Sequence, residues 1–494
     1  MAQLILDGKE HGVKVFVMQI RDENHLPLKG IAIGDLGNKV GDNANDTGYM
    51  SIDNVRIPRT NLLSKYETVT REGKFVTVLK ASPQVHYSTM TLTRAMMICA
   101  SGARLCQAAT IAIRYSCVRK QGFTSFSSNI SYNSEEYQIV DLKIQQYRLF
   151  KQLAHGYAFK LIGMWISEQV ETIEGGELGK LNNIEKLKEV AITSAALKSL
   201  CTQVAYNGIE DLRKCCGGNG YLLNSGIAAL RNEYLVQVTA EGDMAVMAIL
   251  SGKFLAQTID SVKRGNATTG LMDYFNVFSN NNLNIKSLLP QKAKSSTEFF
   301  NIDYLLRLFS YKSLFKCFTL YTEFVKLISE GVELQKAFET LAIEASQATY
   351  SHCYYIILLT FVNKIKQIKN TKISNVLTKL CSLFACTVIK DDNWGDILAS
   401  DQFRLINTAI TSLLSDIRPD CVPLCDSFDY SDYSLKSTIG RYDGNVYEAL
   451  FDAAQHSTLN RQEVFEGYEE VLRPHLNLSL LRYGNKHIDL ITKF

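Results

Sequence analysis

The residue types best suited to chemistry lie within one stretch, residues 213–255, which holds a glycine-dense turn and a glutamate. In the turn, Gly217, Gly218 and Gly220 occupy three of four positions. Glycine tolerates positive φ and lets another molecule approach the backbone closely, so the turn can cradle a polar group. A helix C-cap followed by a loop explains the same glycines, and both interpretations stay open at this point.

Glu241 stands next to apolar residues on both sides. Ala240 precedes it, and the run 244–250 follows Gly242 and Asp243. A carboxylate held beside apolar surface loses hydration, which favours proton uptake and suits the group to act as a general base. A glutamate that complements the dipole at a helix N-terminus is the competing explanation.

Composition and charge limit the classes of function. The chain has 494 residues, of which 46% are hydrophobic, so it can bury sizeable cores in more than one domain. Its 53 Lys+Arg against 50 Asp+Glu give a net charge of only +3. The basic residues are dispersed and are not interleaved with aromatic residues, so we expect no nucleic-acid partner.

The cysteines and the apolar runs indicate the compartment. The 12 cysteines are scattered and form no C-x-x-C pair, and the close pairs lack the histidines of a zinc site. We therefore expect reduced thiols packed as small hydrophobes, in an intracellular protein without a structural metal. The N-terminus does not resemble a signal peptide, and the most apolar run, 354–362, is too short to span a bilayer, so we expect a soluble protein.

Residue patterns predict a mainly helical chain with a partial antiparallel β-domain at its N-terminus. Glycine-punctuated, β-prone pieces fill residues 1–82 and are typical of part of a barrel or sandwich. Apolar residues at helical spacing then cover 89–118, 137–170, 185–216 and 240–259, which favours a four-helix bundle over 83–264. Arg119 and Lys120 close the first of these helices, where basic residues complement the helix dipole.

The second half of the chain is expected to form another helical domain. A segment rich in Asn and Ser, 265–297, is typical of a linker. Helical patterns follow at 302–328, 332–368, 373–390, 394–417, 445–455 and 461–472, within a domain spanning 298–494. The aromatic residues at helical spacing there are explained by core packing, so this half does not by itself indicate chemistry.

Six segments, taken in order, resemble the peroxisomal acyl-CoA oxidases, flavoenzymes that share a fold with the acyl-CoA dehydrogenases. The last of them resembles a C-terminal domain that the dehydrogenases lack. The segments are 30–37 (GIAIGDLG), 48–59 (GYMSIDNVRIPR), 113–121 (IRYSCVRKQ), 216–221 (CGGNGY), 241–243 (EGD) and 440–448 (GRYDGNVYE). The likeness runs over essentially the whole chain and implies an acyl-CoA oxidase-like fold with two C-terminal helical domains.

The resemblance implies a site for FAD and a fatty acyl-CoA. Glu241 corresponds to the family's catalytic base, which removes the α-proton of the thioester. Gly217, Gly218 and Arg119 correspond to residues along the FAD pyrophosphate and adenosine, with Arg119 acting on the flavin of a neighbouring subunit. Backbone and flavin ribityl donors polarise the thioester carbonyl in this family, which implies that no metal takes part. Two departures are mild: Asn219 replaces a frequent His, and Ala240 replaces a bulky neighbour of the glutamate.

The function implied is oxidation of a fatty acyl-CoA to a trans-2-enoyl-CoA in β-oxidation, with dioxygen reduced to hydrogen peroxide. Met1 matches the middle of the family's β-domain, so we expect a short form without the family's N-terminal helical domain. The alternative is an inert structural or regulatory partner of a full-length oxidase; a homodimer is the other assembly expected. The resemblance implies a peroxisomal location, although the last residues, 491–494, are not a Ser-Lys-Leu-like signal.

Overall fold

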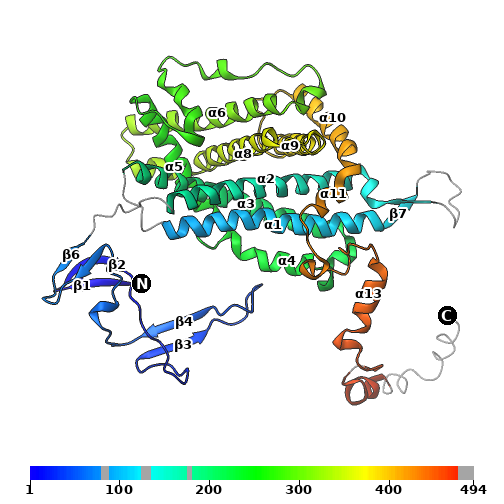
Figure 1. The fold of residues 1–494 in the computed structure, drawn as a ribbon, viewed down its shortest axis with the longest axis horizontal. Coiled ribbons are helices and arrows are strands. Elements are labelled where there is room, and N and C mark those ends of the chain that lie inside the picture. The colour runs from blue at the N-terminus through cyan, green and yellow to red at the C-terminus, as the bar shows by residue number, and fades with distance from the viewer. Residues whose placement is uncertain (79–87, 124–134, 175–180, 465, 477–494) are drawn as a thin grey trace.

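Long helices form the middle of the computed structural model, which describes residues 1–78, 88–123, 135–174, 181–464 and 466–476 (Figure 1). The bundle consists of α1 (Ser88–Val118), α2 (Lys143–Glu174), α3 (Leu181–Cys215) and α5 (Met244–Lys263). Close approach of α1 and α2 depends on Gly102, because a Cβ there would lie 2.3 Å from the backbone nitrogen of Lys160. All four helices predicted for the bundle are present, with ends shifted by a few residues.

The passage between α3 and α5 is more regular than its sequence indicates. Two short 3-10 helices, Gly217–Tyr221 and Leu223–Ser225, precede α4 (Ile227–Tyr234), and another, Leu235–Val238, follows it. The helix α4 buries Ile227, Leu230 and Tyr234. Eight residues of which only three are buried give too short a periodic signal to recognise a helix from sequence.

The C-terminal helices pack on the bundle and share its core. The helices α6, α8, α9 and α10 lie above it in Figure 1, and the largest buried cluster joins residues of both halves, for example Leu153 and Phe384. The expected second half is therefore helical but has no separate core. Its elements are α6 (Ile302–Ser329), α7 (Leu334–Thr340), α8 (Ala342–Gln367), α9 (Thr371–Asp391), α10 (Ser400–Ile417), α11 (Cys421–Asp426), α12 (Asp432–Leu435), α13 (Val446–Gln455) and a π-helical turn Tyr468–Leu472.

Three details of the second half differ from the sequence-based expectation. Among the described residues of 461–472, where a helix is expected, helical structure is limited to the π-helical turn Tyr468–Leu472. The single helix expected over 332–368 is two helices, α7 and α8, which meet at Leu341, where the backbone leaves helical geometry and the side chain is buried. The segment 265–297, expected to be a linker, contains the 3-10 helices Gly270–Ser279 and Ile285–Leu288. It buries Met272, Phe275 and Phe278, so its apolar residues anchor it to the core despite its polar composition.

The N-terminal segment contains short antiparallel pairs rather than one sheet. Within the described residues, β1 (Ala2–Leu6) pairs with β2 (Lys9–Lys14), β3 (Ile31–Asp35) with β4 (Gly48–Ile52), and β5 (Glu67–Val69) with β6 (Phe75–Thr77). Their small cluster of Leu4, Leu62 and Val69 is separate from the helical core. Antiparallel pairing in a partial β-domain is thus as predicted, and each of these pairs is a two-stranded sheet by itself.

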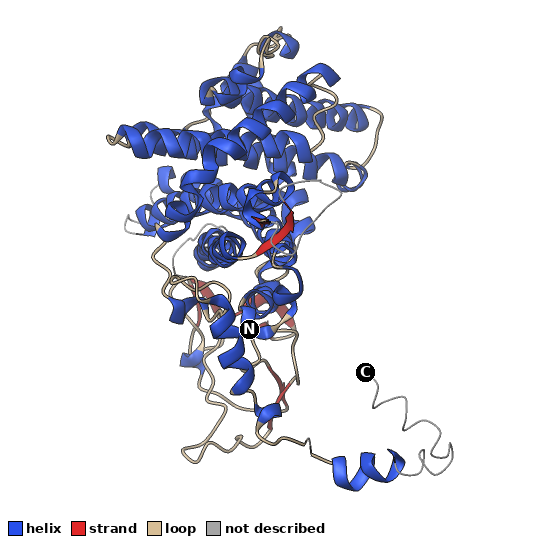
Figure 2. Ribbon diagram, turned by 90° about the vertical axis from the view of Figure 1, so that its right-hand side faces the viewer, coloured by secondary structure: helices blue, strands red, loops and turns tan. Residues whose placement is uncertain are grey.

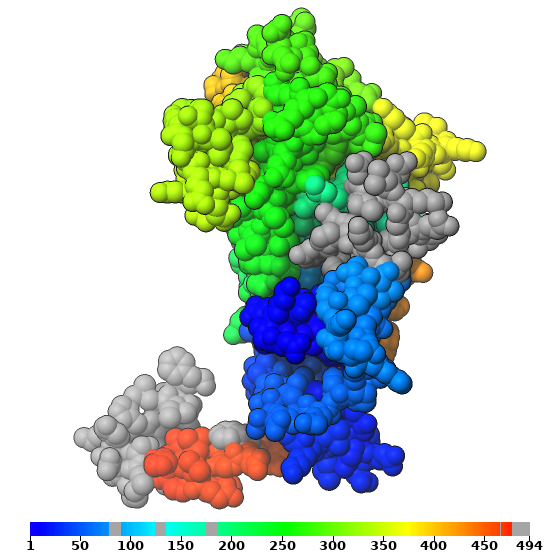
Figure 3. Space-filling model, turned by 90° about the vertical axis from the view of Figure 1, so that its left-hand side faces the viewer, coloured from blue at the N-terminus to red at the C-terminus, as the bar shows by residue number. Residues whose placement is uncertain are grey.

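The three N-terminal strand pairs lie together, whereas a fourth pair, β7 (Lys120–Phe123) with β8 (Glu136–Gln138), follows α1 at the other end of the bundle. Figure 2 shows how few strands there are, and in Figure 3 the N-terminal segment forms a lobe below the helical body. The lobe contacts α4, because a Cβ at Gly41 would lie 2.1 Å from the carbonyl oxygen of Asn232. The boundary predicted at 82 and 83 and the terminal residues 491–494 lie outside the described residues.

Among the residues that the structure describes, two helices are long and apolar enough to cross a membrane by length and composition alone. They are residues 90–118 and α9, and 72% and 56% of their apolar windows are buried inside the protein. Helices in the core of a folded domain have this composition because they are covered by other helices. Burial against protein is the role that the structure gives to both.

Candidate functional site

Glu241 lies in a tight turn immediately before α5. Its φ of 56° and the φ of 112° at Gly242 are both positive. A left-handed conformation costs a residue with a side chain roughly 1–2 kcal/mol, so the turn has to be stabilised by its surroundings. Asp243 caps α5, with its Oδ1 accepting a hydrogen bond of 2.9 Å from the nitrogen of Ala245. The sequence pattern predicts a helix that begins at residue 240. The cap explains why it begins at Met244 instead.

The side chain of Glu241 is exposed in the single chain. Sequence analysis predicts a carboxylate beside apolar surface, and exposed apolar side chains do lie close by, at Ala245 and Val246 of the first turn of α5. Because the Glu241 side chain is exposed in the single chain, its desolvation would have to come from a bound molecule.

Two buried cations bind the carbonyl groups of this turn. Arg94 of α1 donates from Nε and from one terminal nitrogen to the carbonyl oxygen of Glu241, both at 3.1 Å. Lys198 of α3 donates to the carbonyl oxygens of Val238 at 3.0 Å and Gly242 at 2.7 Å. Burial and, to a lesser extent, the nearby Arg94 lower the pKa of Lys198 to about 8. Neither residue is marked by a motif, so sequence reasoning missed both.

The glycine turn lies at the far end of α3. Gly217 has a φ of 57°, as expected for a position that favours glycine, and a Cβ at Gly217 or Gly218 would meet open space. The backbone of this turn is therefore accessible from outside. Asn219 ties the turn to α1, because its Nδ2 donates to the hydroxyl of Tyr115 at 2.9 Å.

Arg119 lies beside the glycine turn. It follows the last residue of α1, and its backbone nitrogen donates to the carbonyl oxygen of Tyr115 at 2.9 Å. Its guanidinium donates to the hydroxyl of Tyr447 at 3.4 Å, a contact that raises the pKa of Arg119. The side chain is half-buried and stays available for an anionic group. Arg119 and the glycine turn thus meet at Tyr115, which Arg119 contacts through its backbone nitrogen and Asn219 contacts through its side chain.

The structure does not bring Glu241 to that group. Arg94 contacts the Glu241 turn near the start of α1, whereas Arg119 follows its end. The 24 residue steps from Arg94 to Val118 span about 36 Å of helix at 1.5 Å per residue. Figure 1 shows the same arrangement, with α5 and the start of α1 at one end of the bundle and β7 (Lys120–Phe123) at the other. The candidate residues therefore form two half-sites at opposite ends of the helical bundle. One is the turn with Glu241, and the other is Arg119 with Gly217 and Gly218.

Arg114, in the arginine-bearing segment 113–121, has structural partners that the sequence did not reveal. Arg114 is buried in α1 and donates to Oδ1 of Asp426 at 2.7 Å and to the carbonyl oxygen of Gly440 at 3.0 Å. These contacts fix the segment that leads to α13 against α1. Because Tyr447 lies in α13, the contacts of Arg114 also support the position of Tyr447, which faces Arg119.

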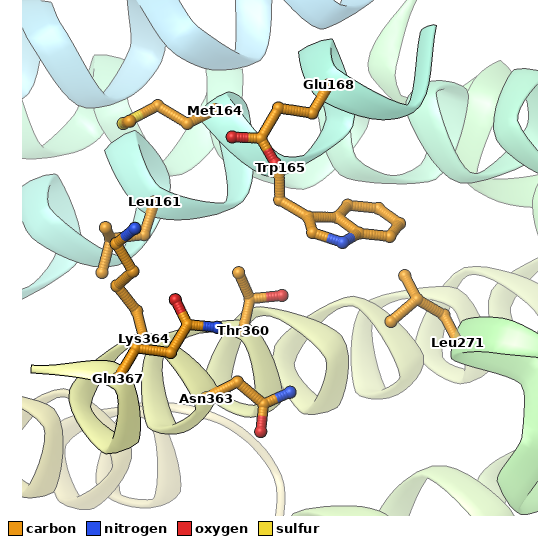
Figure 4. A pocket seen from close by; sticks show the side chains of 9 residues that line it. All are labelled: Leu161, Met164, Trp165, Glu168, Leu271, Thr360, Asn363, Lys364 and Gln367. Carbon is orange, nitrogen blue, oxygen red and sulfur yellow. The ribbon is translucent and has the colours of Figure 1, made fainter. Parts of the chain in front are cut away.

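A surface pocket of about 240 Å³ lies between α2 and α8 (Figure 4). The ring of Trp165 points across it toward Leu271. The lining combines apolar side chains with one acidic and one basic residue: Leu161, Met164, Trp165, Glu168, Leu271, Thr360, Asn363, Lys364 and Gln367. None of the predicted site residues takes part in it.

Cysteines and acidic residues do not gather into a metal site in the part of the chain that the structure describes. Groups of three or more His, Cys, Asp or Glu with suitable geometry are absent from it. The cysteines are free thiols, and all are buried apart from the half-buried Cys99 and Cys117. Their packing is that of small hydrophobes, as the sequence analysis expects.

Comparison with known proteins places these features in a family. Residues 87–256 match the model described as "Acyl-CoA oxidase, C-alpha1 domain", and residues 301–477 match the model described as "Acyl-CoA oxidase". Peroxisomal acyl-coenzyme A oxidase 1 of Rattus norvegicus is 35% identical over 487 residues, which cover 96% of this chain and 71% of the relative. The relative of the same name from Arabidopsis thaliana is 35% identical over 489 residues, covering 97% and 71%.

Solved structures give the same result for the fold. Acyl-CoA oxidase 1 of Arabidopsis thaliana superposes with a TM-score of 0.86 at 34% identity, covering 97% of this chain and 71% of that one. An acyl-CoA oxidase from tomato gives 0.87 at 34% identity, covering 96% and 71%. Acyl-CoA oxidase-1 of Caenorhabditis elegans, solved with FAD and ATP, gives 0.83 at 28% identity, covering 97% and 69%. The chain belongs to the acyl-CoA oxidase family.

Proposed function

We propose that this chain is an FAD-dependent acyl-CoA oxidase of fatty-acid β-oxidation. It would convert a fatty acyl-CoA to a trans-2-enoyl-CoA while dioxygen is reduced to hydrogen peroxide. The observation that carries the proposal is Glu241, the counterpart of the family's base, held in a left-handed turn by two buried cations and exposed to an incoming substrate. The alternative of an inert partner subunit is not favoured by the relatives, which are named as oxidases.

Glu241 would act by taking the α-proton of the bound thioester. A carboxylate whose backbone is already fixed loses little conformational freedom on reaching the reacting carbon, so orientation lowers the barrier. Cover by the acyl chain would remove water from the carboxylate and increase its basicity. FAD, when bound, supplies the acceptor for the β-hydride and passes the electrons to dioxygen.

The second half-site fits the phosphate-bearing part of the cofactor. Gly217 and Gly218 present an open backbone face where no Cβ intervenes, and Arg119 provides a planar cation at the same place. The distance along α1 separates this half-site from Glu241 of the same chain. We therefore propose that Arg119, Gly217 and Gly218 bind the flavin used by Glu241 of a second copy, which requires at least a dimer. A peroxisomal location is proposed from the names of the relatives.

The test is oxidation of a long-chain acyl-CoA by the purified chain supplied with FAD. We expect peroxide in air and bleaching of the flavin without oxygen. Glu241→Gln should abolish the bleaching, while the control Glu233→Gln, which alters an exposed glutamate of α4, should leave it unchanged. A flavin that binds but is bleached equally fast in Glu241→Gln would remove Glu241 from the mechanism. Absence of both flavin retention and peroxide would refute the oxidase function.

A further inference from the structure

The contacts of two buried cations with the turn that carries Glu241 point to a role beyond folding. Arg94 is 8% exposed and Lys198 is 0% exposed, although lysine and arginine are rarely buried without an acidic partner. Their hydrogen bonds to this turn go to carbonyl oxygens: those of Val238, Glu241 and Gly242.

The hydrogen bonds of Lys198 and Arg94 fix the position of the backbone before and after Glu241. Lys198 joins the carbonyl groups of Val238 and Gly242, so it closes the loop across its base. Arg94 binds the carbonyl group between them, that of Glu241 itself, with two nitrogens. When the carbonyl groups of residues 238, 241 and 242 are fixed, the direction in which the Glu241 side chain leaves the backbone is fixed as well.

Lys198 and Arg94, with the carbonyl groups that they bind, form a clamp on the turn. Groups on other elements support this clamp. Ser199, next to Lys198 on α3, donates to the carbonyl oxygen of Met244 at 2.6 Å and contacts the hydroxyl of Tyr350 on α8 at 3.3 Å. Asp243 and Glu241 attract the ammonium group and oppose the effects of burial and of Arg94 on its pKa. The clamp thus joins α1, α3, α5 and α8 around one turn.

From these contacts we propose that Lys198 and Arg94 are positioning residues, which hold the Glu241 turn so that its carboxylate is aimed at the substrate's α-carbon. The proposal rests on the proposed oxidase function. Neither residue touches the reacting atoms. The two act through the backbone, and their loss leaves Glu241 present but free to adopt other directions.

The experiment compares amide hydrogen exchange over residues 236–247 with steady-state kinetics in the same proteins. Lys198→Met keeps the length and apolar stem of the side chain and removes the donor. The matched control is Lys312→Met, because Lys312 is also buried, at 3%, but lies in α6 and contacts Asp392. Loss of the two charged hydrogen bonds that Lys198 donates should speed exchange in the turn about tenfold or more. The control should leave exchange there unchanged.

Kinetics then separate positioning from a merely structural role. We expect Lys198→Met to lower kcat about tenfold or more with KM within about twofold, because substrate binding does not depend on the direction of Glu241. Arg94→Lys keeps the charge but offers fewer donors, and should give a smaller change of the same kind. It also serves as the deciding variant if Lys198→Met does not fold.

Unchanged exchange over 236–247 in a folded Lys198→Met or Arg94→Lys protein would overturn the proposal whatever the kinetics. Faster exchange with an unchanged kcat would also overturn it, since the turn would then be held without effect on the base. If the unaltered chain makes no peroxide, the oxidase function is refuted, and the exchange data still decide whether the two cations hold the turn. The two failures are therefore distinguishable.

Discussion

Glu241 and Arg119 should act in one site only when they come from different chains. The perturbation is a pair of variants that each damage one half-site: Glu241→Gln removes the proposed base, and Arg119→Met removes the cation beside the glycine turn. Each variant alone should form dimers with two defective sites. Mixed dimers should instead contain one site in which both residues are intact and one in which both are altered.

The structure sets the expected magnitude. Arg94, which binds the Glu241 turn, and Val118, which precedes Arg119, are separated by about 36 Å of continuous helix, longer than an extended flavin dinucleotide. If two equal populations exchange subunits at random, half of the dimers are mixed and each has one intact site of two. Activity should then recover to about a quarter of that of the unaltered protein, given a symmetric dimer.

The assay is peroxide production after the two variants are dissociated, mixed and reassociated, or expressed together with different tags. A mixture of Glu241→Gln with Glu241→Gln carrying the other tag is the control and should stay inactive. Recovery that depends on subunit exchange, and that grows with the fraction of mixed dimers, supports two chains per site.

The result that would refute the reasoning is the absence of recovery in verified mixed dimers, because residues that serve one site from the same chain cannot complement each other. Arg119→Met with undiminished FAD binding would separately remove Arg119 from the cofactor site. Neither outcome depends on the identity of the acyl chain.

Three further predictions concern the structural support of the site. Gly242→Ala should lower the free energy of unfolding by about 2–4 kcal/mol, because an overpacked contact with the side chain of Met247 at 2.8 Å adds to the cost of positive φ. The control Gly265→Ala, with positive φ in open space, should lower it by only about 1–2 kcal/mol. Equal urea midpoints for the two variants would contradict this prediction. Burial lowers the pKa of His155 in the folded chain to about 4. As the pH falls below 6.5, the ordinary pKa of histidine, the unfolded chain therefore binds a proton that the folded chain does not. The free energy of unfolding should decrease by about 2 kcal/mol between pH 7 and 5, and by less in His155→Gln. Arg114→Met should destabilise the chain by about 3 kcal/mol in the same urea assay, because Asp426 loses its buried partner.

Helical periodicity predicted the bundle well because these helices bury most of their surface. The helix expected over 89–118 is α1 (Ser88–Val118), and the one expected over 302–328 is α6 (Ile302–Ser329). Both are long, lack proline and carry buried residues along their length. Such patterns survive in sequence because every turn contributes to the core.

Composition predicted other parts less well because burial depends on a few residues. The segment 265–297 is polar on average, yet Phe275 and Phe278 bury it against α5. The break between α7 and α8 follows from the packing of Leu341, which carries no helix-stop signal. Lys198 and Arg94 were missed for the same reason, since a cation that binds carbonyl groups has no characteristic spacing in sequence.

The site also shows why nearness along the chain does not indicate nearness in space. Gly217 and Glu241 are 24 residues apart, and the sequence favoured one site for both. The glycine turn follows the end of α3, but Lys198, 17 residues earlier on that helix, contacts the carbonyl groups of residues 238 and 242. The chain after Gly217 therefore runs back along α3 by about 26 Å before it reaches Glu241. Under the proposed function, a cofactor that needs both the glycine turn and the base would bridge two chains, and the dimer would then be part of the active site.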